Sequence, residues 1–372
     1  MRIRLNNLGR LHANLKADFI SAFERVLDSS AFIQGEEVRR FENAFSNYIG
    51  VENCVGLANG TDSLEIGMQA LGIGVQDIVL VPSLTFVATA EAVVRCGATP
   101  FFVEVDPETL CVNEETLRKA IEESPKPPRA MIVVHLYGRA CPMGEIIRLA
   151  TKQNILVIED CAQAHGARLQ EKFVGSFGEV GSFSFYPGKN LGALGDAGAA
   201  TTKHRDLAEK IRLLRDHGRS EKYVHQIVGR NSRLDSLQAA FLSEKLKHLP
   251  KWTLRRQEIA TLYRTELQNS KGLQLLAEAV EPQSHVYHQF VIRVQSERRD
   301  ELVKFLSSQE IETIIHYPLP VHLQPAFQRS LRAKNLDHTE LAAQEVLSLP
   351  MDPLLTDKEV LEVTMAVRKF FL

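Results

Sequence analysis

The stretch Ile155-Leu156-Val157-Ile158-Glu159-Asp160 has the pattern of a buried strand, an apolar run that ends in two carboxylates. Four similar apolar runs precede it, at residues 54–57, 78–81, 100–103 and 131–135. Each is followed by a segment with helical spacing of its apolar residues, at 64–71, 88–96, 115–121 and 144–152. This alternation predicts an α/β fold, in which a doubly wound, mostly parallel sheet is covered by helices on both faces.

The flanks of this alternating region have a different character. Upstream, apolar residues at helical spacing predict two amphipathic helices within the first fifty residues. Downstream, the segments 182–185 and 197–202 predict two more strands, joined by a short connection. We then expect helices at 234–246, 254–267, 300–307 and 356–370 and strands at 288–294 and 311–315. The chain therefore divides into a large domain, residues 1–248, and a smaller α+β domain, residues 249–372, with a boundary near Pro250.

Composition narrows the class of protein. The 372 residues carry a formal net charge of −2 and no basic tract, so the sequence does not favour a nucleic-acid partner. No apolar run approaches the roughly 18 residues of a membrane span, and the N-terminal residues lack a signal-peptide core. Its five cysteines never form a C-x-x-C pair, which favours reduced thiols over a disulfide or zinc framework. We expect a cytoplasmic protein.

One amine and one carboxylate are the main candidates for chemistry. Lys189 follows an apolar strand pattern, in a Gly-rich loop that carries no acid until Asp196. Asp160 ends the run quoted above. A lysine and a carboxylate at neighbouring strand ends suit pyridoxal 5'-phosphate, whose aldehyde reacts with an amine and whose pyridine nitrogen pairs with an acid. Most lysines are solvated surface residues, but the Gly-rich, uncharged surroundings of Lys189 argue against that interpretation. Taken alone, Asp160 is better explained as a helix cap or salt-bridge partner.

A phosphate site is expected nearby, because ligands of open α/β sheets gather at the carboxyl ends of strands. Gly60 and Thr61 open a helical segment, where free backbone N–H groups and a hydroxyl can bind a phosphate. An ordinary N-cap by Thr61, Asp62 or Ser63 is the simpler interpretation of that turn alone. Ser184 alternates with two phenylalanines and can reach the same phosphate.

Further candidates are aromatic side chains, an amide and histidines. Phe86 can stack on a flat heterocycle or pack in the core, and Gln163 can orient a ring hydroxyl. His165, alone after a strand, is more often a hydrogen-bonded structural residue. His316 and His322 bracket a proline-containing segment without further metal ligands nearby. Contacts of these two histidines to a sugar or phosphate are therefore favoured over a metal site, and from these residues alone a plain proline-rich loop is favoured over both.

Seven ordered motifs make the sequence resemble the DegT/StrS family of sugar aminotransferases, which are fold type I pyridoxal-phosphate enzymes. The motifs lie at residues 58–64, 85–89, 135–138, 159–167, 186–192, 231–240 and 316–318. The resemblance runs nearly end to end. It implies a large cofactor-binding domain with a mostly parallel sheet and a smaller C-terminal domain.

The resemblance also implies a role for each matching residue. Lys189 would form the Schiff base, Asp160 would pair with the pyridine nitrogen and Gln163 would contact the ring oxygen. The other implied cofactor contacts are Phe86 on the ring and Gly60, Thr61 and Ser184 on the phosphate, with Asn231 reaching the phosphate from the other subunit of a homodimer. His165 is counted with Lys189 and Asp160 as catalytic, and the implied substrate contacts are Tyr186, His316, Tyr317 and His322.

The form of the lysine loop indicates the reaction. Some relatives that remove a hydroxyl carry His at the lysine position, so Lys189 favours transamination. The loop 186–192 is most similar to members that aminate C3 of a dTDP-linked 3-keto-6-deoxyhexose, with L-glutamate as the expected donor. The segments 29–32 and 196–198 depart from the usual family pattern. The alternatives are a C4 aminotransferase, a pyridoxal-phosphate-dependent dehydratase or epimerase, and a catalytically silent regulatory paralogue.

Overall fold

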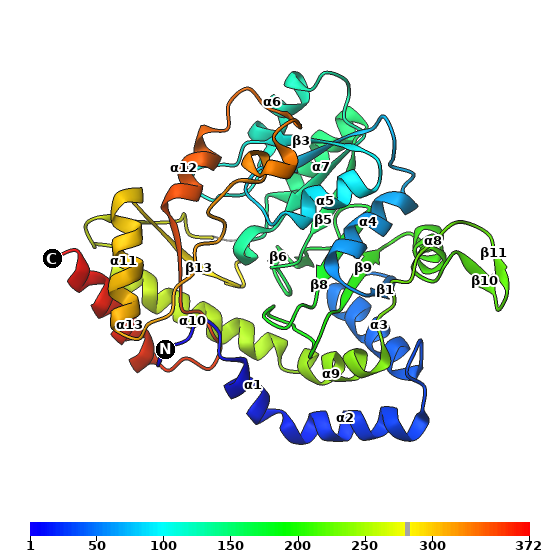
Figure 1. Cartoon of the computed structure of the whole chain (residues 1–372), viewed down its shortest axis with the longest axis horizontal. Coiled ribbons are helices and arrows are strands. Elements are labelled where there is room, and N and C mark those ends of the chain that lie inside the picture. The colour runs from blue at the N-terminus through cyan, green and yellow to red at the C-terminus, as the bar shows by residue number, and fades with distance from the viewer. Residues whose placement is uncertain (280–282) are drawn as a thin grey trace.

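The computed structural model describes residues 1–279 and 283–372 and contains the expected α/β fold (Figure 1). Within these residues, the main sheet has eight strands in the order β1-β9-β8-β5-β4-β2-β3-β14. They are β1 (Asn53–Leu57), β2 (Ile78–Pro82), β3 (Thr99–Val103), β4 (Ala130–Val134), β5 (Leu156–Asp160), β8 (Val180–Ser184), β9 (Gly198–Thr202) and β14 (Leu331–Arg332). The strands from β14 to β8 run parallel, whereas β9 is antiparallel to both of its neighbours.

The central strands β2 and β4 consist of uninterrupted apolar residues because helices cover the sheet. Every residue of β2 and β4 is buried. The covering helices are α4 (Gly60–Ala70), α5 (Ala88–Arg95), α6 (Glu114–Glu123), α7 (Met143–Gln153) and α8 (Arg205–Arg215). Since the parallel strands share one direction, Asp160 at the end of β5 and Ser184 at the end of β8 lie at the same edge of the sheet.

The N-terminal region forms a helical layer against the large sheet. The two expected amphipathic helices are α2 (Lys16–Ser29) and α3 (Glu36–Ile49), and both pack on α9 (Ser236–Leu246). A shorter helix, α1 (Leu8–Asn14), precedes them and was not expected from the sequence. In Figure 1, α1 and α2 run along the lower edge of the molecule, beside α9.

A second, antiparallel sheet lies in the C-terminal part of the chain. Its strands are β12 (Leu273–Leu275), β13 (Phe290–Val294) and β15 (Val346–Leu349), packed with α10 (Leu249–Leu267), α11 (Ser296–Ser308), α12 (Asp337–Glu345) and α13 (Asp357–Phe370). The expected strand at 311–315 is wrong, because Ile311 bridges Ile3 whereas Ile314 bridges Ser348, and these separate partners do not build a ladder. Pro250 stands in the first turn of α10. The proposed division after residue 248 stays a prediction.

Short hairpins and turns complete the described chain. The hairpins are β6 (Arg168–Leu169) with β7 (Lys172–Phe173) and β10 (Arg219–Glu221) with β11 (Val224–His225), and the 3-10 turns are Leu136–Gly138, Val321–Leu323 and Pro325–Phe327. The β10–β11 hairpin projects from the body of the molecule at the right of Figure 1. Among the described residues, every helix is too short or too polar to cross a membrane.

Candidate active site

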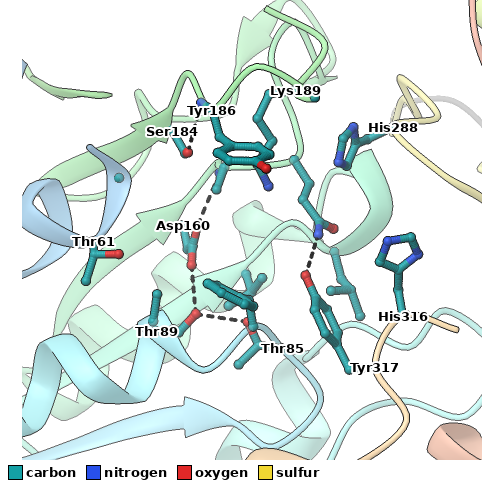
Figure 2. A pocket seen from close by; sticks show the side chains of 18 of the residues that line it. Thr61, Thr85, Thr89, Asp160, Ser184, Tyr186, Lys189, His288, His316 and Tyr317 are labelled. Atoms are coloured by element: carbon teal, nitrogen blue, oxygen red, sulfur yellow. Dashed lines mark hydrogen bonds between the residues drawn. The ribbon is translucent and has the colours of Figure 1, made fainter. Parts of the chain in front are cut away.

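A cavity of about 950 Å³ opens at the edge of the sheet where β2, β4, β5 and β8 end. It lies between the large sheet and residues of the C-terminal region, including His288, His316 and Met351. Figure 2 shows Lys189 and Asp160 directed into this one cavity, as expected from the sequence. An amine and an acid thus reach the same space from different strand ends.

Lys189 is held in a tight loop that leaves β8. Its backbone N–H donates to the Tyr186 carbonyl at 2.8 Å, and the Ala193 N–H donates to the Phe185 carbonyl at 2.8 Å, so the loop closes on the strand end. Burial lowers the pKa of the Lys189 amine to about 8, and the nearby Asp160 carboxylate partly opposes this shift. A substantial fraction of this amine is therefore neutral, and nucleophilic, near pH 8.

Asp160 is the last residue of β5 and is buried. One carboxylate oxygen accepts from the Thr89 hydroxyl at 2.9 Å and the other accepts from the Ala162 N–H at 3.1 Å. Burial raises the pKa of Asp160, while these two donors and Lys189 oppose the rise. The Thr89 hydroxyl is itself 2.9 Å from that of Thr85. The carboxylate is oriented but retains lone pairs for a cationic donor from the cavity.

The turn at Gly60 has the geometry of an anion site. Helix α4 begins at Gly60, and its N-cap is Asn59, whose side chain accepts from the Asp62 N–H at 2.8 Å. The cap is therefore not Thr61, Asp62 or Ser63. A Cβ atom on Gly60 would lie 2.6 Å from the Cβ of Ser184, so the helix start packs directly on β8. Thr61 and Ser184 consequently line the same part of the cavity (Figure 2).

Gln163 and Phe86 also line the cavity. The Gln163 side-chain oxygen accepts from the Tyr137 N–H at 2.6 Å, and its nitrogen donates to the Tyr317 hydroxyl at 2.8 Å. This amide is therefore fixed from both ends. Phe86 is 56% exposed and its ring centroid lies 6.1 Å from that of Tyr317. An aromatic face this open can stack on a flat ligand, which the core interpretation of Phe86 would not allow.

The substrate candidates separate into two groups. Tyr186, His316 and Tyr317 line the cavity. Burial lowers the pKa of His316 to about 4, with a further contribution from Lys189, so this imidazole is neutral at physiological pH. His322 instead lies outside the lining, buried between Ser83 and Glu340.

Two further candidates also lie outside the cavity of this chain. His165 is fully buried, with its ring centroid 5.6 Å from those of both Phe183 and Phe185. Burial lowers its pKa to about 3. Asn231 lies on the surface, where its side-chain oxygen accepts from the Arg233 guanidinium at 3.0 Å.

Several cavity residues were not expected from the sequence. Thr89 and Thr85 orient Asp160, as described above. His288 lines the cavity and its Nδ1 lies 3.1 Å from the side-chain oxygen of Asn190, next to Lys189. His288 and Asn190 are 98 residues apart in the sequence, so no local pattern could predict their contact. Only the Thr85 to Thr89 segment lay in a recognised motif that could have pointed to such a role.

The sequence profile of the DegT/DnrJ/EryC1/StrS aminotransferase family matches residues 13–368. A Streptomyces venezuelae protein named dTDP-3-amino-3,4,6-trideoxy-alpha-D-glucose transaminase is 40% identical, over 99% of this chain and 96% of the relative. A Geobacillus stearothermophilus protein named pleiotropic regulatory protein is also 40% identical, over 100% and 99%. The crystal structure of S. venezuelae DesV in complex with a ketimine intermediate superposes with a TM-score of 0.94 at 40% identity, covering 99% of this chain and 98% of that one.

Proposed function

Because the chain belongs to the DegT/DnrJ/EryC1/StrS aminotransferase family, we propose that it transfers an amino group from L-glutamate to a nucleotide-linked keto-sugar. Its cofactor is pyridoxal 5'-phosphate, as in the family. The observation that carries the proposal is the convergence of Lys189 and Asp160 in one cavity. The name of the S. venezuelae relative supports C3 of a dTDP-linked 3-keto-6-deoxyhexose as the site of amination.

The cavity residues fit this cofactor. Lys189 would hold the aldehyde carbon, Asp160 the pyridine nitrogen and Gln163 the ring oxygen. Gly60, Thr61 and Ser184 would hold the phosphate: all three line the cavity, and Gly60 and Thr61 open helix α4, where the first backbone N–H groups have no partner within the helix. When bound, the cofactor supplies an electron sink for the carbanion formed at the amino-bearing carbon.

Lys189 is the group suited to move the proton. With its pKa lowered to about 8, the amine can accept a proton from one carbon and return it to another under the same conditions. Asp160 presents a carboxyl group at the opposite side of the cavity, oriented by Thr89 and Ala162. Gln163 is fixed by Tyr317, whose ring lies beside that of Phe86 at the cavity wall. The proposed roles of Tyr186 and His316 are contacts to the sugar.

We also propose a cytoplasmic homodimer with a shared active site. The β10–β11 hairpin, which precedes Asn231, carries strongly exposed apolar side chains, Tyr223 at 83% and Val228 just beyond it at 95%. Ile20, Phe23 and Leu27 of α2 form another exposed apolar stripe at helical spacing. A second copy of the chain would cover such surfaces and bring Asn231 to its phosphate site. The five free thiols fit a reducing compartment.

Product analysis tests the proposed reaction. Purified enzyme, pyridoxal phosphate, L-glutamate and a dTDP-linked 3-keto-6-deoxyhexose should yield 2-oxoglutarate and the 3-amino sugar in equal amounts. Borohydride should fix the cofactor on Lys189, detectable as a mass increase of the peptide, and Lys189→Ala should abolish both results. Amination at C4, seen by NMR of the product, would correct the position. Loss of a hydroxyl without 2-oxoglutarate would favour a dehydratase instead.

A regulatory role is the second candidate, because a relative of equal identity is named a pleiotropic regulatory protein. The convergence of Lys189, Asp160 and Gln163 in one cavity argues against a silent protein. A chain that binds no borohydride-reducible cofactor and forms no 2-oxoglutarate with any keto-sugar would favour the regulatory role.

A further inference from the structure

A second lysine, Lys245 on α9, is buried near the loop that carries Lys189. Its side chain is 1% exposed, and among the described residues it has no carboxylate partner. Burying an ammonium group is costly, so such a lysine is expected to neutralise or to bind strong acceptors. Burial lowers its pKa to about 8.

The acceptors of Lys245 come from two separate elements. Its Nζ donates to the Gly192 carbonyl at 2.6 Å and lies 3.1 Å from Nε2 of His12 on α1. Burial and the Lys245 charge lower the pKa of His12, which favours the neutral imidazole that accepts a hydrogen bond. The ammonium also lies 5.9 Å from the ring centroid of Phe19, on α2. Lys245 is thus held at the junction of α1, α2 and α9.

Gly192 ends the loop that begins at Tyr186 and contains Lys189. A Cβ atom on Gly192 would lie 2.3 Å from the Pro187 carbonyl oxygen, so the two ends of the loop are in direct contact. A hydrogen bond that holds the Gly192 carbonyl therefore also holds the rest of this loop in position. A displacement of the Gly192 peptide would move the backbone from which the Lys189 side chain extends.

Two other polar ties hold the same loop. The Asn6 side chain donates to the Gly188 carbonyl at 3.2 Å, and the Asn190 side chain donates to the Val286 carbonyl at 3.2 Å. The Lys245 contact differs from both because its donor is a charged group in a buried setting, where a hydrogen bond is stronger.

We infer that Lys245 is a positioning residue for catalysis: by binding the Gly192 carbonyl, with His12 as its second acceptor, it fixes the loop that directs Lys189 into the cavity. This inference rests on the proposed function, in which Lys189 carries the proton. Lys245 itself does not line the cavity.

The test compares Lys245→Met with Lys210→Met in the holoenzyme. Lys210 donates to the Ala70 carbonyl at 2.7 Å from a more exposed side chain, a lysine-to-backbone bond of nearly the same length that lies away from the Lys189 loop. Because small misplacements of a catalytic group cost up to about 100-fold, we expect kcat of Lys245→Met to fall about 10- to 100-fold, with KM for the keto-sugar little changed. Lys210→Met should keep the wild-type kcat. Equal kcat values for the two variants would overturn the inference.

A second readout does not depend on the substrate. Trace acetylation of the full-length, cofactor-free chain, followed by mass spectrometry across pH, reports the titration of the Lys189 amine. A loosened loop admits water, so the pKa of Lys189 should rise in Lys245→Met from its value of about 8. A rise of one unit would lower the neutral fraction at pH 8 about fivefold. An unchanged titration would contradict the inference even if kcat fell.

A second variant covers the case in which Lys245→Met does not fold, and the acetylation readout covers the case in which the wild-type enzyme is inactive. If Lys245→Met does not fold, Lys245→Leu, which likewise removes the donor to the Gly192 carbonyl, is judged by the same criteria. If wild-type enzyme forms no 2-oxoglutarate, the proposed function fails, whereas acetylation still decides whether Lys245 positions Lys189.

Discussion

Glu159 and Asp160 are consecutive residues at the end of β5, yet the two faces of the sheet surround them differently. On the rear face, Glu159 accepts from His135 at 3.1 Å and from the N–H groups of Gly175 at 2.8 Å, Phe177 at 2.7 Å and Gly178 at 2.9 Å. On the cavity face, Asp160 has Thr89 and Ala162. Side chains alternate along a strand, so neighbours in sequence belong to separate environments.

The number of donors decides what each carboxylate can do. Burial acts to raise the pKa of both groups, but His135 and the backbone N–H groups outweigh burial at Glu159 and lower its pKa. At Asp160 the donors do not outweigh burial, and its pKa is raised. A saturated carboxylate stabilises the fold, whereas a partly satisfied one is available to a ligand. Variants on the two faces should therefore fail in different ways.

The largest expected effect is on the cavity face, from Asp160→Asn. Removing the charge that opposes the pyridine nitrogen should lower kcat/KM about 10²- to 10³-fold, by analogy with the loss of other preorganised electrostatic groups. The thermal unfolding temperature should stay near that of the wild type, because a buried carboxylate with a raised pKa is replaced by a neutral amide. Steady-state kinetics and calorimetry measure the two quantities. Near-wild-type activity of Asp160→Asn would contradict the proposed role of Asp160 in the reaction.

On the rear face, Glu159→Gln should lose about 3 kcal/mol of unfolding free energy at pH 7, because the amide nitrogen of Gln cannot accept hydrogen bonds and leaves buried donors around it without a partner. The folded pKa of Glu159 lies below the ordinary 4.5, so its stabilisation is present above about pH 4.5 and lost as pH falls. The difference from wild type in urea unfolding should accordingly shrink in acid. Activity per folded molecule should remain close to wild type. A Glu159→Gln variant that is as stable as wild type but inactive would contradict the assignment of Glu159 to stability and of Asp160 to activity.

The sequence predicted the cavity face because its signals are local. The apolar run before Asp160 marks a strand, and parallel strand ends meet at one edge, which brings Lys189 to the same place. Ser184 and Gly60 follow from the same rule. The alternation of strands and helices along the sequence predicts a parallel sheet, and the parallel sheet places all of these groups at one edge.

The rear face could not be predicted, since its contacts join distant segments. The rule of parallel strand ends places His135 at the same edge as Glu159. Nothing near Glu159 indicates that the His135 ring turns toward it or that the turn at Gly175 approaches it. The same limit explains His165, which lies within the motif at 159–167 but packs against buried aromatic rings, and His322, which follows the motif at 316–318 but packs between polar side chains. Lys245 likewise binds a carbonyl 53 residues away.

A smaller effect is expected from Thr89→Val, which removes one of the two donors of Asp160. A hydrogen bond to a charged group contributes about 1.5 kcal/mol or more, so kcat/KM should fall about tenfold. Loss of one donor should matter less on the rear face, where Glu159 keeps several others. Replacing Thr85, one step further from Asp160, provides the matched control. An effect of Thr85→Val equal to that of Thr89→Val would show that the direct bond is not decisive.

The smallest effect is a shift in a pH profile. Capture of pyridoxal phosphate by the cofactor-free chain needs the neutral amine of Lys189, so its rate should rise with pH and level off above the amine pKa of about 8. Asp160 raises that pKa, and Asp160→Asn should move the midpoint to lower pH. Glu159 faces away and is not among the charges acting on Lys189, so Glu159→Gln should leave the midpoint in place. Stopped-flow absorbance between pH 6 and pH 10 measures the profile, and equal shifts in both variants would mean that the sheet does not separate its two faces electrostatically.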